Sequence, residues 1–191
     1  MTRTFSDRPV PDELLERLVT LAARAPSAGK TQGWHLVVLE GAHTSRFWDV
    51  TLPPHKRPGF RWQGLLRAPV VAIALADASA YLTRYSEDDK AATGLGSSIE
   101  SWPAPYWTID ASMSVMTMLL AAQDSGLGAL FFGVFHAEKE LRDELGIPDH
   151  LQLLGAVALG WPDVQEAGAD RGRSAARPRR SAEEIIHRNG W

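Results

Sequence analysis

The sequence predicts an α+β fold in a single domain that spans residues 1–191. Apolar runs that suit β-strands occur at several points, and segments with helical periodicity lie between some of them without strict strand–helix alternation. Of the 191 residues, 45% are hydrophobic and 23% are charged, as is typical of one globular domain that can bury a core.

The first helix is expected over residues 11–25. Leu14, Leu15 and Leu18 recur there at helical spacing, which places them on one face of a helix. Pro26 follows directly, and proline disfavours helical backbone in the residue before it. The helix should therefore end at this point.

Two strands and two short helices are expected next. Residues 35–40 and 69–76 are largely apolar, and the second run is continuous and contains β-branched side chains. A continuous apolar run indicates a strand that is buried on both faces. Between the two strands, short helices are expected at residues 42–50 and 62–67.

The chain changes character at residues 77–105, which carry glycines, prolines and acidic residues with little periodicity, so we expect an irregular loop. A helix over residues 107–125 has almost no polar face, which indicates burial. A strand at residues 129–135, a short charged helix at 138–145 and a buried strand at 151–159 complete the predicted elements.

The tail at residues 163–191 is polar and rich in arginine. It ends in the apolar Trp191, so we expect it to pack on another surface. Ser181 and Glu184 have the spacing of a capping box, and this pattern predicts a short helix that starts at Ser181.

Composition argues against several classes of function. The net charge of −3 does not suit a nucleic-acid-binding protein. The lack of cysteine removes thiol nucleophiles and disulfides, and it fits a reducing compartment, so a cytoplasmic location is expected. The six histidines lack metal-ligand spacing, so we predict no metal site. The start does not resemble a signal peptide, and no apolar stretch is long enough to span a bilayer, so we predict no membrane contact.

The loop at residues 24–35 is the most informative part of the sequence. It joins the first helix to the first strand and reads Arg-Ala-Pro-Ser-Ala-Gly-Lys-Thr-Gln-Gly-Trp-His. Its small residues let backbone amides and carbonyls approach a ligand closely, and its side chains add cationic, amide and hydroxyl groups. From spacing alone, a ligand-binding loop and a plain helix-ending turn explain this pattern equally well.

This loop resembles the flavin-binding loop of the nitroreductase family of FMN-dependent oxidoreductases. Three further segments resemble the family in the same order: the start at residues 3–11, the glycine-containing stretch at 126–133, and the basic pair with the segment after it at 178–191. Together they cover nearly the whole chain. Each motif alone is weak, but four in order are fairly specific.

The resemblance implies a fold and an assembly. The family has a central, mainly antiparallel sheet flanked by helices, and it forms intertwined homodimers with two FMN sites at the dimer interface. The tail at residues 163–191 would then be a C-terminal extension that packs on the partner subunit.

The resemblance also implies which residues bind FMN. Arg3 would be the cation beside flavin N1 and the C2 carbonyl, where reduction places negative charge. The backbone at Phe132 and Gly133 would meet the N5 edge, and Arg179 and Arg180 would hold the phosphate. The partner's loop would contact the flavin ring and the ribityl chain through Pro26, Ser27, Ala28 and Lys30.

These residue types also have ordinary structural explanations. Arg3 suits a solvated chain start, and Gly133 suits a glycine bulge in a core strand. Arg179 and Arg180 suit a solubilising basic run, because three other arginines lie just before them.

The implied activity is that of an oxidoreductase with a ping-pong mechanism. NAD(P)H would give hydride to flavin N5 and leave, and a small flat acceptor such as a nitroaromatic or a quinone would then take the electrons. The scheme requires no side-chain acid or base, so we nominate no catalytic residue. Aromatic side chains in and after the 77–105 segment are expected to border the acceptor pocket: Tyr81, Tyr85, Trp102, Tyr106 and Trp107.

The chain departs from the family pattern at two places. An Arg-Arg-Ser that usually precedes the start and holds the phosphate is absent, so either the start is incomplete or other cations bind the phosphate. Lys30 and Gly33 replace an Asn and a Pro, and Lys30 is expected to supply a phosphate or O2 contact. The first departure favours an alternative, a non-catalytic protein that binds or stores flavin on the same fold. Use of a deazaflavin is a third alternative, and the choice between NADH and NADPH stays open.

Overall fold

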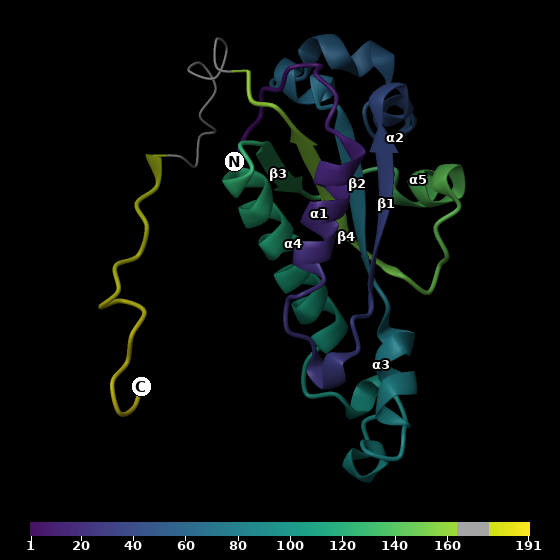
Figure 1. Ribbon diagram of the computed structural model, residues 1–191, viewed down its shortest axis with the longest axis vertical. Helices are drawn as coiled ribbons and strands as arrows, with labels where there is room; N and C mark the ends of the chain where they lie inside the picture. The colour runs from purple at the N-terminus through teal and green to yellow at the C-terminus, as the bar shows by residue number, and fades with distance from the viewer. Residues whose placement is uncertain (164–175) are drawn as a thin grey trace.

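The computed structural model describes residues 1–163 and 176–191. Within these residues, four strands form one antiparallel sheet in the order β1-β2-β4-β3. Helices cover both faces of the sheet (Figure 1), which confirms the predicted α+β class and the mainly antiparallel sheet. The strands are β1 (Trp34–Glu40), β2 (Val70–Ala76), β3 (Gly128–Phe132) and β4 (Gln152–Gly160).

Strand β2 is buried along its whole length, as its continuous apolar sequence predicts. Its side chains alternate between two separate cores, with Val71 and Ile73 in one and Val70 and Ala72 in the other. A polar side chain on either face would be buried without water, so only an apolar run suits this inner position.

Each core is closed by a different pair of helices (Figure 1). Helices α1 (Asp12–Ala22) and α4 (Tyr106–Asp124) pack against each other over one face of the sheet. Helices α2 (Thr44–Thr51) and α5 (Glu138–Leu145) contact each other and contribute to the core on the other face. These four helices agree with the predicted ones to within a few residues.

The N-terminal segment is tied to the sheet by backbone hydrogen bonds. The Thr2 N–H donates to the Ala129 carbonyl at 3.0 Å, and the Ser6 N–H donates to the Trp161 carbonyl at 2.9 Å. These contacts hold Arg3 near the start of β3, although the two segments lie far apart in the sequence.

Residues 77–105 are not wholly irregular, so that prediction was wrong in part. Helix α3 (Ala78–Tyr85) follows β2 directly. Its N-cap is Asp77, whose carboxylate accepts hydrogen bonds from two backbone N–H groups at 2.8 and 3.3 Å. An aspartate in this position satisfies donors that the first helical turn leaves free, and this signal was present in the sequence.

Helix α4 is not fully buried, so the prediction of a buried helix was wrong in part. Ile109, Met116 and Leu120 are 41%, 51% and 59% exposed. They form an apolar stripe along the helix, because residues four and seven positions apart share a face. No helix in the described part of the chain is both long enough and apolar enough to cross a membrane.

The predicted helix at Ser181 is absent, although its capping box forms. The Ser181 N–H donates to Glu184 Oε2 at 2.6 Å, and the Glu184 N–H donates to Ser181 Oγ at 3.3 Å. The chain makes only turns there, and residues 176–191 are exposed throughout. A short helix needs a buried face for stability, and this segment buries none within the protomer.

Strand β4 ends at Gly160, which lies against the ring of Pro69. A Cβ added at Gly160 would lie 2.4 Å from Pro69 Cδ. We expect Gly160→Ala to lower the free energy of unfolding by about 1–3 kcal/mol, because the rigid ring cannot move aside. Urea unfolding followed by circular dichroism measures this loss. Gly59→Ala is the control, because a Cβ at Gly59 meets open space, and equal effects of the two substitutions would contradict the expectation.

Candidate functional site

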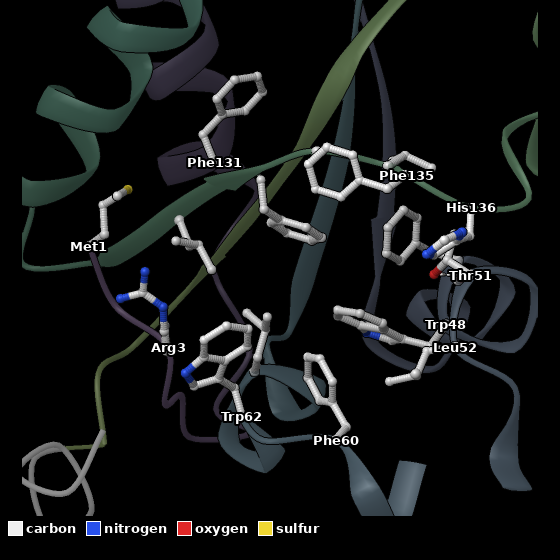
Figure 2. A pocket seen from close by; sticks show the side chains of 16 residues that line it. Met1, Arg3, Trp48, Thr51, Leu52, Phe60, Trp62, Phe131, Phe135 and His136 are labelled. Atoms are coloured by element: carbon white, nitrogen blue, oxygen red, sulfur yellow. Dashed lines mark hydrogen bonds between the residues drawn. The ribbon is translucent and has the colours of Figure 1, made fainter. Parts of the chain in front are cut away.

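A cavity of about 500 Å³ lies between the end of β3, the N-terminal segment and the region from α2 to residue 65 (Figure 2). Its walls are mostly apolar, and side chains from distant parts of the chain meet there. The aromatic residues that line it are Phe47, Trp48, Phe60, Trp62, Phe131, Phe132 and Phe135.

The structure brings three of the sequence-predicted residues together at this cavity: Arg3, Phe132 and Gly133. Arg3 comes from the N-terminal segment, and the other two come from the end of β3 and the residue after it. The guanidinium carbon of Arg3 lies 5.5 Å from the centre of the Trp62 ring, which is a cation–π contact (Figure 2). The contact places a positive charge on the wall of an apolar cavity.

Two tryptophans of the cavity carry hydrogen-bond donors that the described residues leave unused. The Nε1–H groups of Trp48 and Trp62 are buried and have no partner. A buried donor without a partner costs about 1–3 kcal/mol, so both groups are unfavourable features of this wall.

The cavity also offers flat surfaces. The rings of Trp48 and Phe132 are parallel to within 2°, with their centres 6.0 Å apart. Aromatic walls combined with a cation suit a flat ligand that carries acceptor atoms.

The loop residues predicted to bind flavin lie elsewhere on the protomer. Pro26, Ser27 and Lys30 line a separate depression together with Arg24. None of them is among the described residues that line the Arg3 cavity of the same protomer. This separation is compatible with a role in the partner's site, which stays a prediction.

Helices α3 and α4 hold this loop. The Ala28 N–H donates to Asp110 Oδ2 at 2.7 Å, and Arg84 Nε donates to the Gly29 carbonyl at 2.9 Å. The Tyr81 hydroxyl donates to the same Asp110 oxygen at 2.8 Å. Burial raises the pKa of Tyr81, and the bond to Asp110 raises it further, so the hydroxyl stays protonated and remains a donor.

Arg179 and Arg180 lie on the exposed tail and not among the residues that line the cavity. The Arg180 guanidinium donates to the backbone carbonyl of Glu184. Their assignment to a phosphate therefore stays a prediction.

The five aromatic residues expected at an acceptor pocket form a cluster of their own. Tyr85 and Trp102 have ring centres 4.6 Å apart, and Tyr81 and Trp102 have theirs 5.7 Å apart. None of the five is among the described residues that line the Arg3 cavity of the same protomer. The cluster lies beside the loop instead, where the Tyr85 ring packs on Gly29.

Sequence reasoning missed the aromatic residues that do line the cavity, above all Trp48, Phe60 and Trp62. Phe60 and Trp62 did offer a signal. They flank an arginine in a segment without clear periodicity, and aromatic residues outside a regular helix or strand are candidates for contact with a ligand. Trp48 gives no such signal, since its position on α2 is indistinguishable from that of an ordinary core residue.

Asp77 fixes the start of α3, the helix that carries Tyr81 and Arg84 toward the loop. Burial opposes ionisation of the Asp77 carboxyl. The hydrogen bonds from Ser79 and Ala80 outweigh this effect and hold the pKa of Asp77 below its ordinary value.

We expect Asp77→Ala to lower the free energy of unfolding by about 1 kcal/mol at neutral pH, because the helix loses its N-cap. Asp77→Asn is the matched control, since asparagine keeps an oxygen that can cap the helix but lacks the added stabilisation of the ionised carboxylate. A lowered pKa stabilises the fold above the unfolded value of about 3.9, and this contribution disappears as pH falls through the folded pKa. Urea unfolding of wild type and Asp77→Asn should therefore converge in acid, and a gap that does not change with pH would argue against this origin.

Comparisons with known proteins agree on one family. The nitroreductase family model matches residues 1–99 and 100–161. A protein of Archaeoglobus fulgidus (strain ATCC 49558), provisionally named NADH dehydrogenase/NAD(P)H nitroreductase, is 30% identical over 163 residues, which span 84% of this chain and 79% of that protein. A 4-nitrobenzoate reductase of Nocardioides sp. (strain LMS-CY) is 29% identical and covers 85% of this chain and 77% of its own.

A solved structure supports the same fold. The FMN-dependent nitroreductase of Clostridium difficile R20291 superposes with a TM-score of 0.64, covering 100% of this chain and 94% of its own. The two sequences are 20% identical, so this likeness concerns the arrangement of helices and strands.

Proposed function

The chain belongs to the nitroreductase family of oxidoreductases, and from this membership we propose an FMN-dependent enzyme that uses NAD(P)H as its reductant. The acceptor would be a small flat aromatic molecule such as a nitroaromatic or a quinone. The observation that carries the proposal is the convergence of Arg3, Phe132 and Gly133 on one aromatic cavity. The relatives named NAD(P)H nitroreductase and 4-nitrobenzoate reductase support the reductant and the class of acceptor.

The residues of the cavity fit an isoalloxazine ring. The ring is flat and carries carbonyl oxygens and ring nitrogens along one edge. The aromatic walls offer apolar surface against which such a ring can pack. Arg3 supplies a cation that the carbonyl oxygens and ring nitrogens can meet.

Bound FMN would supply two-electron redox chemistry, by accepting hydride from NAD(P)H and passing it to the acceptor. Arg3 would stabilise the negative charge that reduction adds to the flavin, an effect that is strong at the edge of an apolar cavity. The backbone at Phe132 and Gly133 would bind the flavin edge, next to the Phe135 ring that packs against Gly133. The aromatic walls would orient the ring and exclude water.

A homodimer would complete the site. The loop with Pro26, Ser27, Ala28 and Lys30 lines no part of the cavity within its own protomer, so it would reach the cavity of the partner. The exposed apolar stripe on α4 supports such an interface, because folded proteins rarely leave a contiguous apolar surface uncovered. The C-terminal tail would pack on the partner and bring its arginine pair to the phosphate.

The first test is the visible absorption spectrum of the purified protein after it is loaded with FMN and desalted. We expect a retained flavin band that bleaches on anaerobic addition of NADH or NADPH and returns when a nitroaromatic or a quinone is added. A retained band that neither nucleotide bleaches would favour the non-catalytic flavin-binding alternative. A protein that retains no flavin would overturn the proposal.

Arg3 provides a residue-level test. We expect Arg3→Met to weaken FMN binding by about ten- to a hundredfold, because a charge-assisted contact worth about 1.5–3 kcal/mol is lost. The matched control is Arg8→Met, since Arg8 also lies over a tryptophan, with its guanidinium carbon 4.1 Å from the centre of the Trp161 ring, but does not line the cavity. Titration of FMN fluorescence measures both affinities, and equal losses in the two variants would count against a flavin contact at Arg3.

A further inference from the structure

Asp110 is a buried carboxylate near the start of α4. It is 5% exposed, and one of its two carboxylate oxygens, Oδ2, accepts two short hydrogen bonds. One comes from the Tyr81 hydroxyl at 2.8 Å, and the other comes from the backbone N–H of Ala28 at 2.7 Å. A buried carboxylate is costly unless hydrogen bonds replace its lost water, so these two donors stabilise Asp110 where it lies.

The second bond ends in the loop that the proposed function assigns to FMN. Just after Ala28 the backbone is left-handed at three residues, with φ of 61° at Gly29, 56° at Lys30 and 54° at Gln32. Glycine adopts this conformation freely, but for lysine and glutamine it costs about 1–2 kcal/mol each. The surrounding structure must therefore hold the loop in this shape.

The other contacts to this part of the loop are closer to solvent. Arg84 donates to the Gly29 carbonyl, but its guanidinium also pairs with the exposed carboxylates of Glu87 and Asp89. The bond from Ala28 to Asp110 ends at a buried carboxylate, where hydrogen bonds are stronger and salt screens them less. Asp110 is thus a shielded anchor point for this strained turn.

We propose that Asp110, itself oriented by Tyr81, is a positioning residue that holds residues 26–30 in the shape that binds FMN. The inference rests on the proposed function, because it takes this loop to be a flavin contact. Asp110 touches neither cofactor nor acceptor in this scheme. Because the loop would serve the partner's cavity, Asp110 of one protomer would set the FMN affinity of the site that the partner lines.

Three substitutions separate the parts of this anchor. Asp110→Leu has a similar volume and removes the acceptor. Asp110→Asn keeps one oxygen, which can still accept both bonds because both go to the same atom. Tyr81→Phe removes one donor and leaves the bond to the loop. Met118→Ala is the matched control, because Met118 is fully buried on the same helix and its loss opens a cavity without touching the loop bonds.

Two measurements are made on each full-length variant, and both are compared with its thermal unfolding midpoint. The first is hydrogen–deuterium exchange of peptides from residues 24–35 in the FMN-free protein. The second is the dissociation constant for FMN. The exchange measurement does not depend on turnover, so it reports on the loop itself.

We expect Asp110→Leu to exchange faster in the loop and to bind FMN at least about tenfold more weakly, the shift produced when the loop holds its binding shape a tenth of the time or less. Asp110→Asn should restore most of both properties, and Tyr81→Phe should fall between Asp110→Asn and Asp110→Leu. If Asp110→Leu fails to fold, the remaining proteins give the same test: loop exchange should become faster and FMN binding weaker in the order wild type, Asp110→Asn, Tyr81→Phe.

The inference is overturned if wild type binds FMN while Asp110→Leu and Tyr81→Phe change loop exchange and FMN affinity no more than Met118→Ala does. A wild-type protein that binds no FMN would instead overturn the proposed function, and this inference with it.

Discussion

The two inner strands of the sheet are buried on both faces, and this burial dictates where the helices and the N-terminal segment must lie. Strands β2 and β4 carry apolar side chains to two separate cores, and each core needs its own cover. Helices α1 and α4 cover one face. On the other face α2, α5 and the segment around residues 54–67 provide the cover, and the cavity with Arg3 lies within that layer.

Two areas of uncovered apolar surface stand out among the described residues. One is the cavity beside Arg3, and the other is the outer face of α4. Contiguous exposed apolar surface is unfavourable in water, so further contacts that cover it would stabilise the protein. A flat acceptor-rich ligand and a second copy of the chain are the occupants that the proposed function provides.

The loop at residues 24–35 shows a different balance between local preference and tertiary contact. Its left-handed residues include Lys30 and Gln32, for which this backbone conformation is unfavourable. Contacts from α3 and α4 offset that cost, and the most shielded of them ends at Asp110. Hydrogen bonds from α3 and α4 thus hold an unfavourable backbone conformation in a loop that the proposed function places at the flavin.

The α+β class and the four strands, to within a few residues, could be predicted from the sequence, because periodicity reports the local backbone and the burial of each residue. Arg3, Phe132 and Gly133 were nominated by the family resemblance, and the structure places them at one cavity, while their role toward a flavin stays a prediction. The lining of that cavity by Trp48, Phe60 and Trp62 and the hydrogen bond from the loop to Asp110 became visible only in the folded chain. These are contacts between segments distant in sequence. The residues next to a side chain in the sequence do not specify which distant segment that side chain will contact.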